Sequence, residues 1–348
     1  KLEDRPNNQF GYAIEGKAAG VQVIRPSGQP QAGFSIRVRG TSTITSGSEP
    51  LYIVDGVPTE NTQEINPADI ENLTVLKDAS AAAIYGSSGA NGVVLITTKR
   101  GHNQPTRVAL NAYTGYSSPW RKLDVLNAAQ YKDLMTEMGL NTDWASYPNN
   151  NYWQDQVFRT ANAQNYQVSL TGGNEKTGYY MSGSWMKQDG IVLTNTVRRA
   201  NFKLNLDHSI NKIFKVGTSI AYSRWKDVDV DEAGRFGAVM SSLSGSPVTG
   251  VYDNEGHFAI DPFISDVENP VGLLLKNDHK WINYRFNGNV YAEAQVLPSL
   301  KLRTMFGLEH TDGTYNGWVD PFRSREGRGF KGIADLSNSN YDYWISEN

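Results

Sequence analysis

The second half of the chain is dominated by long stretches in which apolar and polar residues alternate. The clearest examples are RANFKLNLDHSI (199–210), FKVGTSIAYSRW (214–225) and NYRFNGNVYAEAQV (283–296). In the first stretch, Phe202, Leu204 and Leu206 fall on one face, and the polar residues between them fall on the other: Asn201, Lys203, Asn205 and Asp207. A period of two over such lengths predicts antiparallel strands with one apolar and one polar face.

The same signals predict about eight strands, near 106–117, 163–172, 177–188, 196–210, 213–227, 280–296, 299–315 and 334–346. Short joints such as HSINKIF and VLPSLK contrast with long ones such as 228–279. Aromatic residues gather towards strand ends, among them Tyr113, Tyr116, Trp120, Trp185, Tyr222, Trp225, Trp281, Tyr284, Tyr343 and Trp344. This combination is typical of an outer-membrane β-barrel. The alternative is a soluble β-sandwich, whose strands are usually shorter.

The first part of the chain has a different pattern, of short apolar runs separated by turn residues. The runs lie at 21–25, 34–39, 51–55, 73–76 and 93–98. Between the last two, Asp78 is a suitable N-cap, three alanines favour a helix, and Gly86 is a natural C′ residue. We assign Asp55 and Gly56 to a turn. The sequence therefore predicts an α+β domain over residues 1–103, followed by antiparallel barrel strands over 104–348.

One helix is expected among the strands, at 126–139. Leu126, Ala129, Leu134 and Met138 have roughly helical spacing, and Gly139 ends the run. We expect this helix in a loop outside the bilayer.

Several functional classes find no support in the sequence. The net charge is -3 and the basic residues are dispersed, which argues against binding of nucleic acid. The chain has no cysteine, and its histidines are too scattered for a helical zinc site: His102, His208, His257, His279 and His310. No run of about 18 apolar residues is present, and the first ten residues do not resemble a signal peptide.

The glycine-rich stretch LKDASAAAIYGSSGANGVVLITTKRG (76–101) is the one candidate for a phosphate loop. Its glycines, Gly86, Gly89 and Gly92, follow a helix and precede a strand, which reverses the order of a dinucleotide-binding fingerprint. No P-loop lysine follows, and no G-x-S-x-G elbow occurs. We expect no enzyme activity and no cofactor, and we interpret these glycines as turn residues.

A weak calcium motif lies near the end of one predicted strand. Asp227, Asp229 and Asp231 have the 1, 3, 5 spacing of a calcium loop, but Glu232 and Ala238 occupy positions where an EF-hand needs Gly and Glu. The alternatives are a looser calcium site in an external loop and a solvated strand end.

Residues 11–101 closely resemble the plug of SusC/RagA-type TonB-dependent outer-membrane transporters of the Bacteroidetes. The matching stretches are EGKAAGVQV (15–23), SIRVRG (35–40), PLYIVDGVP (50–58) and INPADIENLTVLKDASAAAIYGSSGANGVVLITTKRG (65–101). Further along, LNAAQY, VSLTGGNEKTGYYMSGSWMKQDGIV and RANFKLNLD are similar to the first barrel strands of that family.

The resemblance implies a plug inside a barrel of about 22 strands. It also implies outer-membrane lipid around the barrel, energy from the TonB–ExbB–ExbD complex, a SusD-like surface lipoprotein as partner, and oligosaccharide or peptide cargo. The TonB-contacting segment of the family would precede Lys1. An eight-stranded barrel has no room for a domain of roughly 100 residues, and an open sheet edge cannot face lipid, so we expect further strands in the functional molecule.

By the same resemblance, three loops are the expected plug apices facing the lumen mouth: RPSGQPQAG (25–33), TSTITSGSE (41–49) and TENTQE (59–64). The candidate ligand contacts are Gln29, Thr43, Ser46, Glu60 and Asn61, although turns favour these residue types without any ligand. The remaining alternatives for the whole protein are a non-transporting barrel, either porin or adhesin, and a secreted β-rich glycan-binding protein.

Overall fold

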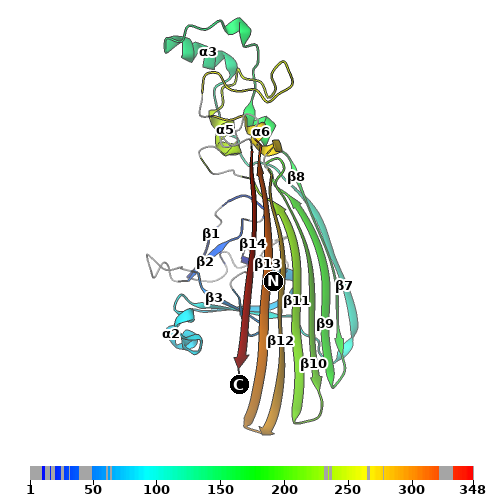
Figure 1. Cartoon of the computed structure of the whole chain (residues 1–348). Helices are drawn as coiled ribbons and strands as arrows, with labels where there is room; N and C mark the ends of the chain where they lie inside the picture. Colours follow the sequence, from blue (N-terminus) through cyan, green and yellow to red (C-terminus); the bar gives the residue numbers. More distant parts are fainter. Residues whose placement is uncertain are drawn as a thin grey trace.

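The structure, a computed structural model, has two parts: a small domain and a tall sheet that stands beside it (Figure 1). It describes residues 10–11, 16, 20–24, 27–30, 32–38, 49–59, 62, 65–230, 234, 237–264, 267–276, 278–320 and 332–347.

The tall sheet, called the wall below, is one antiparallel meander in the order β14-β13-β12-β11-β10-β9-β8-β7. Its strands are β7 (Gln104–Ser117), β8 (Ala161–Gly173), β9 (Thr177–Asp189), β10 (Thr196–Ser209), β11 (Phe214–Val228), β12 (Asp278–Leu297), β13 (Leu300–Val319) and β14 (Ile333–Glu347). All eight predicted strands are confirmed to within a few residues. They form one sheet instead of two packed ones, so the β-sandwich alternative was wrong.

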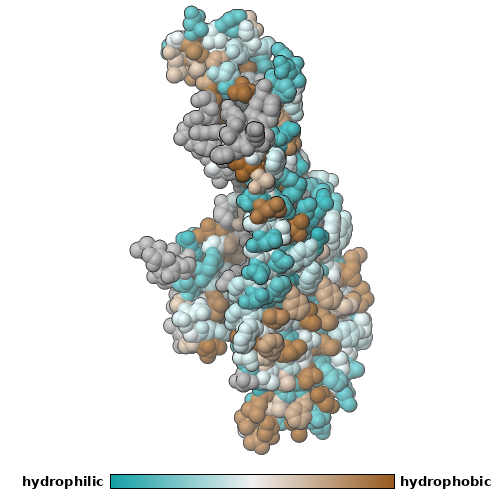
Figure 2. Space-filling view, viewed as in Figure 1, coloured by the Kyte–Doolittle hydropathy of each residue, from teal (hydrophilic) through white to brown (hydrophobic). Residues whose placement is uncertain are grey.

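The two faces of the wall differ as the alternation predicts. Lys203 and Asn205 are buried on the face towards the small domain, the inner face, whereas Phe202 and Leu206 on the outer face are 40% and 38% exposed. Apolar residues colour much of the lower wall in Figure 2. An apolar outer face suits hydrocarbon, and a polar inner face needs polar partners. β7 and β14 each have one described neighbour, so the sheet is open at both edges.

Five of the ten predicted girdle aromatics are exposed on the outer face: Tyr116, Trp185, Tyr222, Tyr284 and Trp344. For four others the prediction was wrong, because they lie on the inner face: Tyr113, Trp225, Trp281 and Tyr343. Trp225, for example, is only 5% exposed. All four occupy odd-numbered positions, and on these strands the odd positions point inward because successive side chains alternate.

Loop lengths separate the two ends of the wall. At one end the turns 174–176, 210–213 and 298–299 are short. At the other end, long connections carry α3 (Ala128–Glu137), η4 (Trp144–Ser146), α4 (Trp153–Val157), α5 (Ala238–Ser244) and α6 (Pro270–Lys276), which form the lobe at the top of Figure 1. No helix in the described part of the chain is long and apolar enough to cross a membrane.

The predicted helix at 126–139 is present as α3, but its buried face differs from the prediction. Asn127 and Gln130 form a capping box, and Gly139 follows the helix with φ of 88°. Ala128 and Tyr131 are buried, whereas Leu126 and Met138 are 41% and 73% exposed. The reason is the aromatic cluster of the lobe, in which Tyr131 packs against Trp144 and Phe263.

The small domain contains two sheets. β1 (Val21–Ile24) pairs with β2 (Ser35–Val38), and β3 (Leu51–Val54), β4 (Val57–Thr59), β5 (Ile70–Leu76) and β6 (Val93–Thr98) form a second sheet in the order β4-β3-β6-β5. Their shared core includes Phe10, Ile36, Tyr52, Val94 and Ile96.

β4 was missed by the sequence signals because it has only three residues. It forms a hairpin with β3 through Asp55 (φ 50°) and Gly56 (φ 94°). Two consecutive left-handed residues are typical of a tight hairpin turn, so the turn assigned to Asp55 and Gly56 is confirmed.

The helix in the glycine-rich stretch is also shorter than predicted. Its helix is α2 (Ala79–Ala82) followed by the 3-10 segment η3 (Ala83–Gly89), with η2 (Pro67–Asp69) preceding β5. Asp78 stands at the N-cap position, but its side chain makes no capping hydrogen bond. Gly86 interrupts η3 with φ of 60° and ψ of -146°, a conformation open to glycine.

Candidate functional site

The small domain is held against the inner face of the wall by buried polar side chains, and Asp55 lies at the centre of this interface. Its Oδ2 accepts from Lys203 Nζ at 2.7 Å and from Ser219 Oγ at 2.8 Å. Thr98 donates to Asp55 from both its backbone N–H (2.9 Å) and its hydroxyl (2.6 Å). Asn289 Nδ2 donates to the Asp55 carbonyl at 2.7 Å. One turn residue thus binds β6 and the three wall strands β10, β11 and β12.

The charge on Asp55 is stabilised by these contacts. The side chains of Asp55 and Lys203 are only 2% and 5% exposed. Burial alone would raise the pKa of Asp55, but the Lys203 charge and the hydrogen bonds from Lys203 and Thr98 outweigh it and lower the pKa to about 2. Removing either partner would leave a buried charge without compensation.

Asp69, at the end of η2, makes the second anchor. Its Oδ1 accepts from Gln167 Nε2 (2.7 Å), Tyr180 OH (2.7 Å) and Ser182 Oγ (2.6 Å) on β8 and β9. Burial raises the pKa of Asp69, although the hydrogen bonds from Ser182 and Tyr180 oppose this. Asp55 has a charged donor in Lys203, whereas the side-chain donors to Asp69 among the described residues are neutral.

A third anchor joins β4 to β12 and β13. Arg285 Nε lies 3.2 Å from Glu309 Oε1, and these side chains are 5% and 1% exposed. Thr59 donates to Glu309 Oε1 at 3.1 Å and is itself hydrogen-bonded to Arg285. Asn287 Nδ2 completes the cluster by donating to Glu309 Oε2 at 3.2 Å.

The chain segment after β6 makes the fourth anchor. Asn205 Nδ2 donates to the Thr98 hydroxyl and to the Lys99 carbonyl, both at 2.7 Å. Arg100 NH1 lies 2.7 Å from Asp207 Oδ1, which is also hydrogen-bonded to Tyr291.

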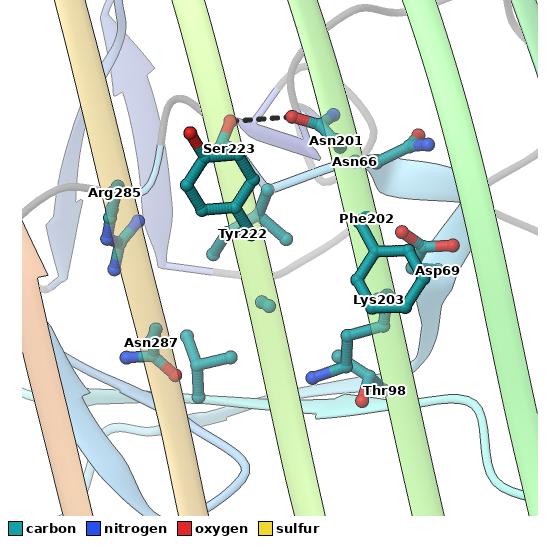
Figure 3. A pocket seen from close by; sticks show the side chains of 13 residues that line it. Asn66, Asp69, Thr98, Asn201, Phe202, Lys203, Tyr222, Ser223, Arg285 and Asn287 are labelled. Carbon is teal, nitrogen blue, oxygen red and sulfur yellow. Dashed lines mark hydrogen bonds between the residues drawn. The ribbon is translucent and has the colours of Figure 1, made fainter.

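Figure 3 shows a small cavity that these anchors surround. It measures about 50 Å³, and its lining includes Asn66, Asp69, Thr98, Lys203, Arg285 and Asn287. Asn201 and Ser223 flank it within the wall and are joined by a hydrogen bond of 2.6 Å. Val54, Ile65 and Ala221 give the rest of the cavity lining an apolar character. A space of this size is large enough for water beside the anchor groups.

Of the predicted ligand contacts, the structure describes Gln29, and Thr43, Ser46, Glu60 and Asn61 lie outside the described residues. Gln29 Nε2 donates to the Val230 carbonyl at 2.7 Å, and its Oε1 accepts from Asn195 Nδ2 at 3.1 Å. It lines a polar cavity of about 270 Å³, the outer pocket, together with Ser27, Pro30, Ala32, Asn195, Thr196, Val197, Asp227, Val228 and Asp229.

Two of the three calcium-motif aspartates, Asp227 and Asp229, therefore line the same pocket as Gln29. Asp231 lies outside the described residues. Across the described residues, no group of three or more potential metal ligands is arranged to hold an ion. Calcium binding by these aspartates stays a prediction.

The anchoring role of Asp55 and Asp69 was missed by the sequence analysis, which assigned Asp55 to a turn alone. A signal was present, because the inner faces of the predicted strands carry Lys203, Asp207 and Arg285, and charges in a buried position need partners. Acidic residues in apolar surroundings of the first domain, as in IVDG and NPAD, were the available candidates.

Comparisons with known proteins agree with this architecture. The family model described as TonB-dependent Receptor Plug Domain matches residues 1–93. TonB-dependent receptor P3 of Formosa agariphila is 32% identical over 358 residues, covering 100% of this chain and 35% of that protein. TonB-dependent receptor SusC of Bacteroides thetaiotaomicron is 33% identical over 347 residues, covering 89% and 34%.

A solved structure shows the same arrangement. The RagAB peptide importer in its open-open state superposes with a TM-score of 0.82 at 25% identity, covering 93% of this chain and 41% of that one. The chain spans about a third of the length of the curated relatives named above. With a plug domain docked on the inner face of antiparallel barrel strands, and relatives named as receptors and not as enzymes, the chain belongs to the SusC/RagA type of TonB-dependent receptors, which are outer-membrane proteins of Gram-negative bacteria.

Proposed function

We propose that the protein imports oligosaccharides or peptides across the outer membrane of a Bacteroidetes-like bacterium. Residues 1–103 act as the plug, and residues 104–348 form the first part of the barrel wall. The TonB–ExbB–ExbD complex supplies the energy, and a SusD-like surface lipoprotein delivers the cargo. The names of the relatives, SusC and the RagAB peptide importer, support this proposal.

The observation that carries the proposal is the polar character of the docking interface. Asp55, Asp69, Thr59 and Arg100 are all held to the wall by hydrogen bonds or ion pairs. Such groups can exchange protein partners for water at a small net cost, about 0.5–1.5 kcal/mol for a typical hydrogen bond. An apolar interface has no such exchange, because exposing apolar area to water is unfavourable in proportion to that area. The plug is therefore fixed in position but releasable.

Ligand binding on the outer side belongs to the same proposal. Gln29, Thr43, Ser46, Glu60 and Asn61 contact cargo at the plug apices. The outer pocket, into whose lining Gln29 falls, supports this assignment.

A reversible covalent lock tests the proposal. Thr98→Cys with Asn205→Cys joins plug and wall where Asn205 Nδ2 and Thr98 Oγ1 are 2.7 Å apart. This chain contributes no competing cysteine. We expect the oxidised double variant of the full-length protein to lose energised uptake and to regain it on reduction.

The matched control is a second pair that bridges two wall strands and leaves the plug free. Asn201→Cys with Ser223→Cys links directly opposed residues of β10 and β11. Oxidation of this pair should leave uptake unchanged. Undiminished uptake by a fully oxidised plug–wall pair would show that the plug does not separate from the wall during import.

A further inference from the structure

Three aromatic residues form a stacked cluster on the inner face of the wall, nearer to the lobe than the polar anchors. This aromatic ledge consists of His279 and Trp281 on β12 and Tyr315 on β13. The rings of Trp281 and Tyr315 are 4.7 Å apart between centroids and tilted by 38°. His279 lies nearly parallel to Tyr315, at 19°, with Nδ1 2.6 Å from the tyrosine hydroxyl.

A glycine sets the orientation of the ledge. Gly317 is the register partner of His279, and a Cβ added there would lie 2.7 Å from the Tyr315 hydroxyl oxygen. The Tyr315 ring therefore lies along the wall over Gly317, with its hydroxyl towards His279. All three ledge residues are half-buried and keep some accessible surface.

The ledge adjoins the outer pocket. Asp227, which lines the pocket, is the register partner of Trp281. Asp229, another lining residue, donates its backbone N–H to the His279 carbonyl at 2.9 Å. The aromatic rings thus lie next to the carboxylates of Asp227 and Asp229 and the side-chain amides of Gln29 and Asn195.

This chemistry suits sugar rings. A pyranose presents a face of C–H groups that packs on the electron-rich face of an aromatic ring. Its hydroxyls need hydrogen-bond partners, which carboxylates and amides provide. The described residues that line the outer pocket include no lysine or arginine, so the pocket favours neutral over anionic cargo.

The same position suits an extended peptide poorly. Peptides commonly bind by adding a strand to an open sheet edge. β12 is paired with β11 on one side and β13 on the other, so its backbone groups are already used. The ledge offers side chains and no free edge.

We infer that the aromatic ledge and the outer pocket together form a subsite for neutral sugar rings of an oligosaccharide. The inference rests on the proposed import function, since it names which of the two cargo classes the lumen accepts.

Binding to the purified full-length protein in detergent tests the inference. The probes are short neutral oligosaccharides of glucose, mannose, galactose or xylose, and a pool of random-sequence peptides of similar length. We expect at least one oligosaccharide to bind, and Trp281→Ala to weaken it about tenfold, which is the loss of about 1.4 kcal/mol. Trp318→Ala is the matched control, because Trp318 lies at a similar height on β13 but is 41% exposed on the outer face. It should leave affinity unchanged.

A second variant separates ring geometry from ring removal. Gly317→Ala keeps all three aromatic residues but displaces Tyr315, and it should weaken the same oligosaccharide. The inference is overturned if no oligosaccharide binds, if Trp281→Ala leaves binding intact, or if peptides bind instead and depend on Trp281. Because the assay needs no energy source, its outcome is independent of whether the plug opens, which the disulfide lock tests separately.

Discussion

Asp55, in the tight turn between β3 and β4 of the plug, forms an ion pair with Lys203 in the middle of wall strand β10. The Nζ–Oδ2 distance is 2.7 Å, and the two side chains are 2% and 5% exposed. The pair is as deeply buried as Arg285 and Glu309, the other buried ion pair described at this interface. Removing one partner of the Asp55–Lys203 pair should therefore be strongly destabilising.

Lys203→Met should destabilise the docked plug by about 3–5 kcal/mol, since the Asp55 carboxylate would be buried without its cation. Asp55→Asn alone should also be destabilising, because Lys203 loses its counter-charge. The double variant should cost less than the sum of the two, which a double-mutant cycle on thermal unfolding of the full-length protein would measure. Strict additivity would mean that the pair does not act as a unit.

Acid should weaken docking through Asp55. Its pKa in the docked state, about 2, lies below its ordinary value of 3.8, so its contribution is complete above about pH 4 and is lost as pH falls towards 2. The shift corresponds to a contribution on the order of 2 kcal/mol. Plug stability followed from pH 5 down to pH 2 should fall in the wild type and stay flatter in Asp55→Asn.

Asp69 should have the opposite pH dependence. Burial raises its pKa above 3.8, so the docked plug binds a proton more readily than the released plug. The contribution of Asp69 to the stability of the docked plug should therefore decline as pH rises from about 4 through the raised pKa. Asp69→Asn keeps an acceptor for Tyr180 and Ser182 and should remove this slope. An unchanged slope in the variant would assign it to another group.

Thr59 should matter for docking but not for the wall. Thr59→Val removes the hydroxyl that donates to Glu309, while Arg285 stays within 3.2 Å of that carboxylate. We expect a loss of about 1 kcal/mol in plug stability and no change in barrel assembly. Arg285→Met should lower both plug stability and barrel assembly, because it leaves Glu309 buried without a cation. Equal effects of the two variants would contradict this division of roles.

Gly101 marks the crossing from plug to wall. A Cβ there would overlap the backbone of Tyr179 and Gly172, which cannot rotate away. Gly101→Ala should therefore reduce the yield of folded protein. Gly183→Ala is the control, since its added methyl meets nothing within 4 Å. Similar yields for the two variants would show that the crossing has room to adjust.

The strands were predictable because their signal is local. A period of two, read over ten or more residues, identified β10, β11 and β12 and correctly divided Phe202 from Lys203. The ends of the helices were predicted less well. The helix after Asp78 was expected to continue to Gly86, but α2 ends at Ala82 and the Gly86 conformation interrupts the segment that follows.

The anchors could not be predicted from the sequence because their partners are distant. Asp55 and Lys203 are separated by 148 residues, and their contact depends on the register of β10 and on the placement of the whole plug. The buried face of α3 was predicted wrongly for the same reason, since Tyr131 packs against Phe263 of another loop. Local periodicity specifies elements, whereas docking depends on which polar groups remain unpaired when the elements assemble.

The central claim is that the plug leaves its polar anchors during import, and labelling of Ser219→Cys tests it most directly. Ser219 is 2% exposed beneath Asp55. In cells that express the full-length variant, with any other cysteine replaced, the thiol should react slowly with a membrane-impermeant maleimide at rest. It should react faster when cargo is supplied and the inner membrane is energised. A labelling rate that stays at its resting value while cargo is being imported would contradict the account.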